Sequence, residues 1–212
     1  MRDIKLSDRQ FNFVLGGTVV YGVLINTIIA FLLSNFQFTT EILIITLIAS
    51  LVLGIGGVIV AIKSDNPIVS FIGYNMLVIP FGVSIASTVQ MYSSKIVFEA
   101  FVMTLLITII MMLVSSLYPR VFLSLGRMLF VALLGLIIAG FVCVFALGTY
   151  PTILSIISAG IFSLYIGYDW VSAQTGYKTL DNAIDSALDI YLDIVNLFLD
   201  LLQILAASSD DW

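Results

Sequence analysis

Seven long apolar runs dominate this sequence, and each is long enough to cross a lipid bilayer as an α-helix. A hydrocarbon core about 30 Å thick requires roughly 20 apolar residues per helix. The runs cover residues 11–34, 42–62, 68–91, 97–117, 128–147, 152–172 and 180–206. We therefore expect an all-α multi-pass membrane protein with a cytoplasmic N-terminal segment (1–10), a seven-helix transmembrane domain (11–207) and a short acidic tail (208–212).

The composition excludes several classes of protein. Only 10% of the residues are charged and 61% are hydrophobic, so the chain cannot build a water-exposed surface of ordinary polarity. Eight basic residues against thirteen acidic ones argue against nucleic-acid binding. The chain has no histidine and a single cysteine, Cys143, which argues against histidine-based catalysis, a disulfide and a multi-cysteine metal site. We expect neither an enzyme nor a tightly bound cofactor.

The basic residues predict how the seven helices are oriented. Short cytoplasmic segments of membrane proteins carry an excess of Lys and Arg. With a cytoplasmic N-terminus, only Lys95 of the eight basic residues falls on the outer side. The others are Arg2, Lys5, Arg9, Lys63, Arg120, Arg127 and Lys178. We expect a cell-membrane protein with its N-terminus in the cytoplasm and its C-terminus outside.

The glycine-rich stretch Gly54-Ile55-Gly56-Gly57 is similar in composition to a phosphate-binding loop. It lies inside an apolar helix, however, and lacks the strand–turn–helix context of a nucleotide site. Glycines in membrane helices allow two backbones to approach closely. We therefore expect close helix packing at this stretch.

The seventh run carries polar residues at helical spacing. Asp181, Asp185, Asp189, Asp193, Asn196 and Asp200 are separated by 4, 4, 4, 3 and 4 positions. At about 100° per residue, the last five fall on one helical face. A charged residue costs about 2.5–3.5 kcal/mol at the bilayer centre, so we expect the other six helices to surround this central C-terminal helix. Such aspartates indicate an ion or proton path. The alternatives are a helix lying flat on the membrane, or aspartates that only bond neighbouring helices.

The sixth run offers a surface for close approach of the seventh. Ser155, Ala159, Ser163 and Gly167 recur every four residues and form a seam of small residues. Asp169 lies at the edge of this seam, and a short connection folds the seventh helix back beside it. Asp169 and Asp193 can therefore meet, share one proton and titrate as a unit. This pair is our candidate pH sensor.

Two motifs in these helices resemble the signature of the transmembrane Bax inhibitor motif family. They are FSLYIGYD at 162–169 and YLDIVNLF at 191–198, whose aspartates are 24 residues apart. The stretch VFEAF at 97–101, which contains Glu99, is similar to the fourth-helix motif of that family. The resemblance implies a pH-sensitive calcium leak with six helices around the seventh, in which Asp169 and Asp193 are the gating pair. Glu99, Tyr165, Tyr168 and Tyr191 would support the pair.

These observations favour a calcium-permeable leak channel that is gated by the aspartate pair. Asp185, Asp189, Asn196 and Asp200 would line the ion path, with Asp189 and Asp193 as transient ligands of calcium, which prefers oxygen ligands. The expected partners are calcium ions, protons and the lipid bilayer. The alternative is a non-transporting modulator that binds a membrane-bound protease or another membrane protein, as some bacterial family members do. A secondary transporter and an intramembrane hydrolase are less favoured, because the sequence has no internal repeat and no evident substrate gate.

Overall fold

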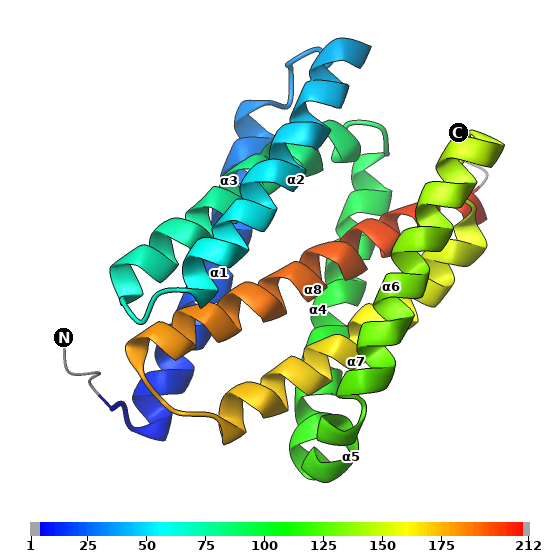
Figure 1. Ribbon diagram of the computed structural model, residues 1–212. Coiled ribbons are helices and arrows are strands. Elements are labelled where there is room, and N and C mark those ends of the chain that lie inside the picture. Colours follow the sequence, from blue (N-terminus) through cyan, green and yellow to red (C-terminus); the bar gives the residue numbers. More distant parts are fainter. Residues whose placement is uncertain (1–4, 210–212) are drawn as a thin grey trace. The chain divides into compact units, whose positions relative to one another are not determined.

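The computed structural model describes residues 5–209, and its regular elements in this range are all helical (Figure 1). They are α1 (Asp8–Leu32), α2 (Thr40–Ile62), α3 (Pro67–Val89), α4 (Ser94–Leu117), α5 (Pro119–Ser124), α6 (Gly126–Val142), the π-helical turn η1 (Cys143–Leu147), α7 (Thr152–Thr175) and α8 (Leu180–Ser208). Seven of them are long and apolar enough to cross a membrane, α6 together with η1 forming one of these spans. The seven predicted spans are thus confirmed. The predicted N-terminal segment and acidic tail lie partly outside the described residues.

Polar caps explain where the first four helices begin. Side-chain oxygens of Ser7, Thr39, Asn66 and Ser93 accept hydrogen bonds from backbone N–H groups of the first turn. Such caps satisfy donors that have no partner within the helix. The sequence did not predict the short helix α5, which begins directly at Pro119. A proline fits the first position of a helix because its missing N–H is not needed there.

The chain forms two compact units, and α8 contributes to both. The first unit contains α1, α2, α3 and the part of α8 up to Tyr191, and the second contains α4 to α7 and the part of α8 from Leu192. In the first unit, α2 and α3 cross at Gly57 and Gly73, where each glycine lies against the backbone carbonyl of the other. Close packing at the glycine-rich stretch is confirmed.

In the second unit, α7 packs against α4, α5 and α6. Phe122 of α5 and Ser115 of α4 fill the space beside Gly167. The predicted seam therefore does not face α8 along its whole length, and the prediction is wrong at Gly167. Because four residues advance a helix by about 40° more than one turn, a seam at this spacing winds around the helix over three steps.

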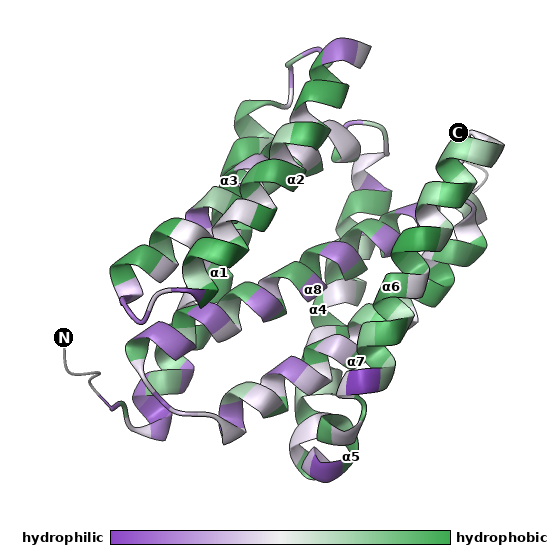
Figure 2. Cartoon of the chain, viewed as in Figure 1, coloured by the Kyte–Doolittle hydropathy of each residue, from purple (hydrophilic) through white to green (hydrophobic). Residues whose placement is uncertain are grey.

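The outward surfaces of several helices are apolar. Figure 2 shows almost continuous hydrophobic colour along α2 and α6, whereas hydrophilic residues recur along α8. Many large apolar side chains are exposed, among them Ile45 and Val52 on α2 and Val131 and Ile138 on α6. Surfaces of this kind require lipid as their solvent. The chain is a multi-pass membrane protein.

Candidate functional site: the carboxyl pair of α7 and α8

The second unit brings Asp169 of α7 and Asp193 of α8 together. Their carboxyl groups lie within hydrogen-bonding distance of each other. Asp193 is 6% exposed, and Asp169 is partly buried. An ionised carboxylate only accepts hydrogen bonds, so a bond between two carboxyl groups requires a proton on one of them. The arrangement allows the two carboxyl groups to share one proton.

One tyrosine of α7 lies beside the pair, and a second tyrosine packs against the first. Tyr165 is close enough to interact electrostatically with both Asp169 and Asp193. Its ring is in edge-to-face contact with that of Tyr168, at a centroid distance of 6.4 Å. Tyr168 in turn packs against Gly126 at the start of α6, where a side chain would collide with its ring. The aromatic residues thus connect the pair to α6.

A second polar cluster of this unit lies further along α8. The buried hydroxyl of Ser158 donates a hydrogen bond of 2.5 Å to Oδ2 of Asp200, which is 8% exposed. Ser155 donates to Oε1 of Gln203 at 2.7 Å. Nε2 of Gln203 donates to the carbonyl of Tyr150, also at 2.7 Å. These bonds connect α8 to α7 and to the loop that precedes α7.

The polar residues that recur at helical spacing along α8 form an acidic stripe: Asp181, Asp185, Asp189, Asp193, Asn196 and Asp200. Two acids of this stripe, Asp181 and Asp185, lie in the first unit. Asp181 is 6% exposed, and its Oδ1 accepts a 2.7 Å hydrogen bond from Ser70 of α3. Asp185 lies one turn further along, and its buried Oδ1 has no hydrogen-bond partner among the described residues. A buried oxygen without a donor is costly, and a proton, a water molecule or a cation would satisfy it.

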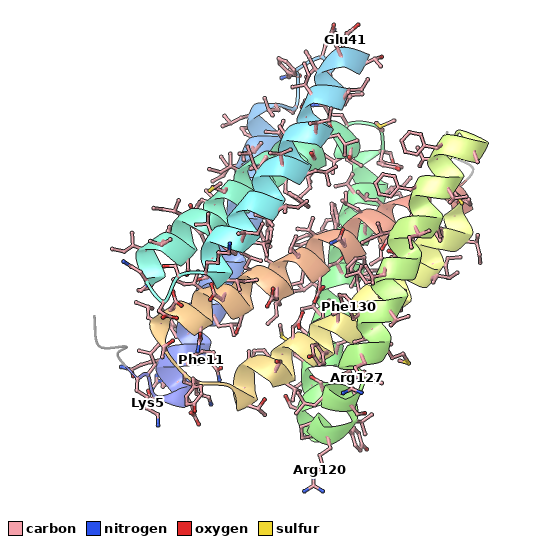
Figure 3. The ribbon with its side chains drawn as sticks, in the orientation of Figure 1. Lys5, Phe11, Glu41, Arg120, Arg127 and Phe130 are labelled. Atoms are coloured by element: carbon pink, nitrogen blue, oxygen red, sulfur yellow. The ribbon has the colours of Figure 1, made fainter. Side chains whose placement is uncertain are left out.

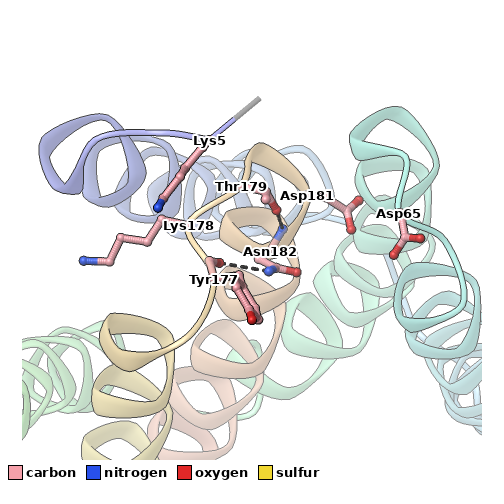
Figure 4. Close-up of a pocket in the computed structure, with 7 residues that line it drawn as sticks. All are labelled: Lys5, Asp65, Tyr177, Lys178, Thr179, Asp181 and Asn182. Atoms are coloured by element: carbon pink, nitrogen blue, oxygen red, sulfur yellow. Dashed lines mark hydrogen bonds between the residues drawn. The ribbon is translucent and has the colours of Figure 1, made fainter. Parts of the chain in front are cut away.

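A pocket of about 460 Å³ opens beside Asp181 (Figure 4). Its lining residues are Lys5, Asp65, Tyr177, Lys178, Thr179, Asp181 and Asn182. Figure 4 shows the two lysines on one side and the two aspartates on the other. The backbone N–H of Leu6 donates to the carbonyl of Lys178 at 2.8 Å, and the ammonium of Lys178 pairs with Asp8 at 2.8 Å. Leu6 and the first residue of α1 are thus bonded to the connection that precedes α8.

Tyr191 takes part in a buried polar cluster of the first unit. Its hydroxyl accepts a hydrogen bond of 2.5 Å from the Asn26 amide of α1. Its ring lies 5.6 Å from that of Tyr74, and the Tyr74 hydroxyl donates to the carbonyl of Thr18 at 2.8 Å. The cluster holds α1, α3 and α8 together.

The remaining predicted site residues are Glu99, Asp189 and Asn196. Glu99 is exposed in the second turn of α4. Trp170, the residue next to Asp169, donates to Ser116 near the C-terminal end of α4. The second turn of α4 is at the opposite end of that helix and is therefore distant from the pair. Asp189 is exposed, and the Asn196 amide donates to the Leu192 carbonyl of its own helix.

Within residues 5–209, no three cysteine or acidic side chains are grouped closely enough to hold a metal ion. The assignment of Asp189 and Asp193 as transient calcium ligands therefore stays a prediction.

The sequence analysis missed Ser70 and Ser158, which bond acids of α8, and Gln203, which bonds Ser155 and the Tyr150 carbonyl. Gln203 follows Asp200 by three residues and so continues the 3-and-4 spacing of the stripe. Ser158 follows Ser155 by three residues and lies on the same side of α7. Helical spacing could therefore have predicted both positions. Ser70 lies on a different helix, and nothing in the sequence around it indicates its contact with Asp181.

Comparison with known proteins agrees with the resemblance in the two motifs. The family model described as "Inhibitor of apoptosis-promoting Bax1" matches residues 14–210. A Helicobacter pylori protein with the name "Uncharacterized protein" is 37% identical over 89 residues, which are 41% of this chain and 37% of that protein. The "Golgi anti-apoptotic protein" of vaccinia virus (strain Lister) is 34% identical over 127 residues, 59% of this chain and 53% of the viral protein.

A Streptococcus pyogenes serotype M3 protein with the name "Uncharacterized membrane protein" is 28% identical over 130 residues, 58% of this chain and 57% of that protein. The chain thus spans 37–57% of the length of these relatives. The family model, in contrast, covers nearly the whole chain. This protein belongs to the Bax inhibitor-1 family of membrane proteins, the family with transmembrane Bax inhibitor motifs.

Proposed function

We propose that this protein is a pH-sensitive, calcium-permeable leak channel whose gate is the carboxyl pair Asp169 and Asp193. The observation that carries the proposal is the contact between these two carboxyl groups at the α7–α8 interface. With one shared proton, a hydrogen bond holds the helices together. With none, two like charges repel each other in a site of low dielectric constant. Gain or loss of the shared proton thereby favours one of two arrangements of the helices over the other.

The free energy available from this pair is sufficient for gating. Each tenfold difference in the proton affinity of the pair between the two arrangements is worth about 1.4 kcal/mol. Conformations that interconvert in working proteins differ by a few kcal/mol. A difference of about 100-fold to 1,000-fold in proton affinity would thus move the equilibrium from mostly closed to mostly open.

The acidic stripe of α8 supports calcium as the permeant ion. Asp185, Asp189, Asn196 and Asp200 repeat at intervals of three to four residues around Asp193. Their side chains offer oxygen ligands, which suit a hard divalent cation. No basic residue follows Lys178, so α8 has no positive charge to oppose a cation. Ions would pass from one acid to the next, each site weak enough to release them.

The experiment that tests this proposal is calcium flux into proteoliposomes at several pH values. Wild type is compared with Asp169→Asn and Asp193→Asn, and Asp65→Asn is the matched control at an exposed position outside the helices. Asparagine keeps the size of aspartate and cannot share a proton as a carboxylic acid does. We expect both pair variants to lose the pH dependence of flux and Asp65→Asn to retain it. Unchanged flux and an unchanged pH profile in both pair variants would overturn the proposal.

A second candidate is a modulator that acts by contact with another membrane protein. The name of the vaccinia relative, an anti-apoptotic protein, describes an effect of that protein and no transport. An absence of calcium flux above that of empty liposomes, for a folded wild type, would move this candidate to first place. A membrane-bound protease would then be the first partner to test by co-purification.

We further propose that the N-terminus lies in the cytoplasm. In the first unit, Lys5 lies near the start of α1, and Glu41 lies at the opposite end of that unit (Figure 3). In the second unit, Arg120 and Arg127 lie at the end where α5 joins α6. Thiol labelling of Arg127→Cys and Lys95→Cys, each with Cys143→Ser, tests this orientation. Only Lys95→Cys should react with an impermeant reagent added to intact cells.

A further inference from the structure

The hydrogen bonds of Gln203 form a fixed connection that the proposed gate does not itself use. Its Oε1 accepts from Ser155 of α7, and its Nε2 donates to the Tyr150 carbonyl in the preceding loop. Both ends of the amide are therefore bonded, and they bond two different segments. Nearby, Ser158 bonds Asp200. These contacts fix α8 to α7 at two successive positions.

These contacts define the register between the two helices. A step of three residues along α7, from Ser155 to Ser158, corresponds to a step of three in the opposite direction along α8, from Gln203 to Asp200. Continued by seven residues, this antiparallel register brings Asp193 level with Tyr165. Asp169 lies one further turn along α7. The carboxyl pair is thus a diagonal contact between positions about one helical turn apart.

The diagonal contact is possible because of the direction in which helical side chains point. Cα–Cβ bonds of an α-helix tilt toward its N-terminus. In antiparallel helices these tilts oppose each other, so Asp169 leans toward the level of Tyr165 and Asp193 leans toward the level of Asp169. A turn of helix rises 5.4 Å, which is near the limit that two short side chains can span. A small sliding of α7 against α8 would therefore separate the carboxyl groups.

We propose that Gln203, through Ser155 and the Tyr150 carbonyl, is a positioning residue that fixes the α7–α8 register in which Asp169 and Asp193 share a proton. This inference rests on the proposed function for its physiological meaning, but the register and the titration of the pair can be measured without it. Gln203 touches neither carboxyl group of the pair and acts on them only through the position of α8.

The groups that face the pair are the same in all the variants proposed below. On α7 these are Tyr165, within reach of both carboxyl groups, and Tyr168 beside it. From α4 and α5, Ser115 and Phe122 pack against Gly167, close to Asp169, and neither can ionise. A change in titration after substitution of Gln203 or Ser155 therefore reports a change in position.

The test follows the protonation of the pair by infrared difference spectroscopy of the full chain in liposomes. The carboxyl C=O band of the pair is identified by its loss in Asp193→Asn, and its midpoint is measured against pH. The informative variants are Gln203→Leu and Ser155→Ala. Ser155→Thr keeps the hydroxyl, and Ser163→Ala is the matched control, since the Ser163 hydroxyl donates to the Ala159 carbonyl of its own helix.

We expect Gln203→Leu and Ser155→Ala to move the midpoint toward acid by at least about half a pH unit, a threefold loss of proton affinity. The shared proton is released more easily because the bond that holds it is weakened. Ser155→Thr and Ser163→Ala should keep the wild-type midpoint. Unshifted midpoints in Gln203→Leu and Ser155→Ala, or an equal shift in Ser163→Ala, would overturn the inference.

Two further measurements keep the outcomes distinct. Circular dichroism establishes whether each variant is folded. If Gln203→Leu is not folded, the comparison of Ser155→Ala with Ser155→Thr decides alone. Calcium flux is measured on the same liposomes. A shifted band without flux in any variant would refute the leak and retain the positioning role. Flux that depends on pH with an unshifted band would retain the leak and refute the positioning role.

Discussion

The crossing of α2 and α3 allows a sharp prediction, because two neighbouring glycines differ in their surroundings. A Cβ atom on Gly57 would collide with the backbone carbonyl of Gly73 and lie 3.1 Å from Cβ of Met76. A Cβ atom on Gly56 would meet only the flexible end of Met76, at 3.7 Å, which is an ordinary contact. The change from glycine to alanine is chemically the same at both positions.

The expected magnitudes follow from two opposing effects. Alanine is favoured over glycine inside a helix by about 1 kcal/mol. Inserting a methyl group into a closely packed contact costs about 1–3 kcal/mol, and here the obstacle is backbone, which cannot rotate away. Gly57→Ala should therefore lose up to about 2 kcal/mol of unfolding free energy, whereas Gly56→Ala should gain up to about 1 kcal/mol. The two variants should differ by about 2 kcal/mol, since the packing cost applies to only one.

The assay is thermal unfolding of the detergent-solubilised chain, followed by circular dichroism. For a chain of this size, 1 kcal/mol corresponds to about 2–4 °C, so the melting temperatures should differ by about 4–8 °C. Gly16→Ala in α1, where a Cβ meets no neighbouring atom within 4 Å, is a second control. Equal melting temperatures for the Gly57 and Gly56 variants would refute the packing argument. They would show that α2 and α3 separate freely at this crossing.

Two further predictions concern α7 and use the same assay. Ser158→Ala removes the hydroxyl that bonds Asp200 and should lower the unfolding free energy by about 0.6–1.7 kcal/mol, which runs from the average to the maximum measured for interhelical bonds in a membrane protein. Ser163→Ala should have little effect, and equal losses in the two variants would contradict the reasoning. Gly167→Val places a branched side chain where Phe122 lies and should cost about 1–3 kcal/mol. A melting temperature equal to that of wild type would show that α5 moves aside.

The helices of this protein could be predicted well from the sequence, because each apolar run must satisfy its own backbone hydrogen bonds in lipid. That requirement depends on length and hydropathy, which are local properties. The short helix α5 escaped prediction because its six residues carry no long periodic pattern. Its position is instead set by contact, with Phe122 filling the space beside Gly167.

The candidate site could be predicted only in part. Helical spacing placed the acids of α8 on one face, and the short connection between α7 and α8 predicted that Asp169 and Asp193 can meet. The diagonal character of the contact was not predictable, because it depends on the register between α7 and α8, to which the bond between Ser155 and Gln203 belongs. Tyr191, which we expected to support the pair, bonds Asn26 of α1, and this contact between residues 165 positions apart could not be read from local sequence.

The partners of the buried acids explain how such a stripe can remain usable inside a membrane. Asp181 is bonded by Ser70, and Asp200 by Ser158, so each carboxylate has a neutral hydroxyl as its donor. Removing one partner of a buried ion pair costs about 3–5 kcal/mol, whereas an interhelical hydrogen bond in a membrane averages only about 0.6 kcal/mol. The smaller value is close to thermal energy, so a carboxylate can exchange its serine for a proton or a cation. A lysine or arginine at the same place would hold the acid permanently. The absence of basic residues after Lys178 and the serines that bond Asp181 and Asp200 are thus what the proposed ion path requires, because its groups must release the ions that they bind.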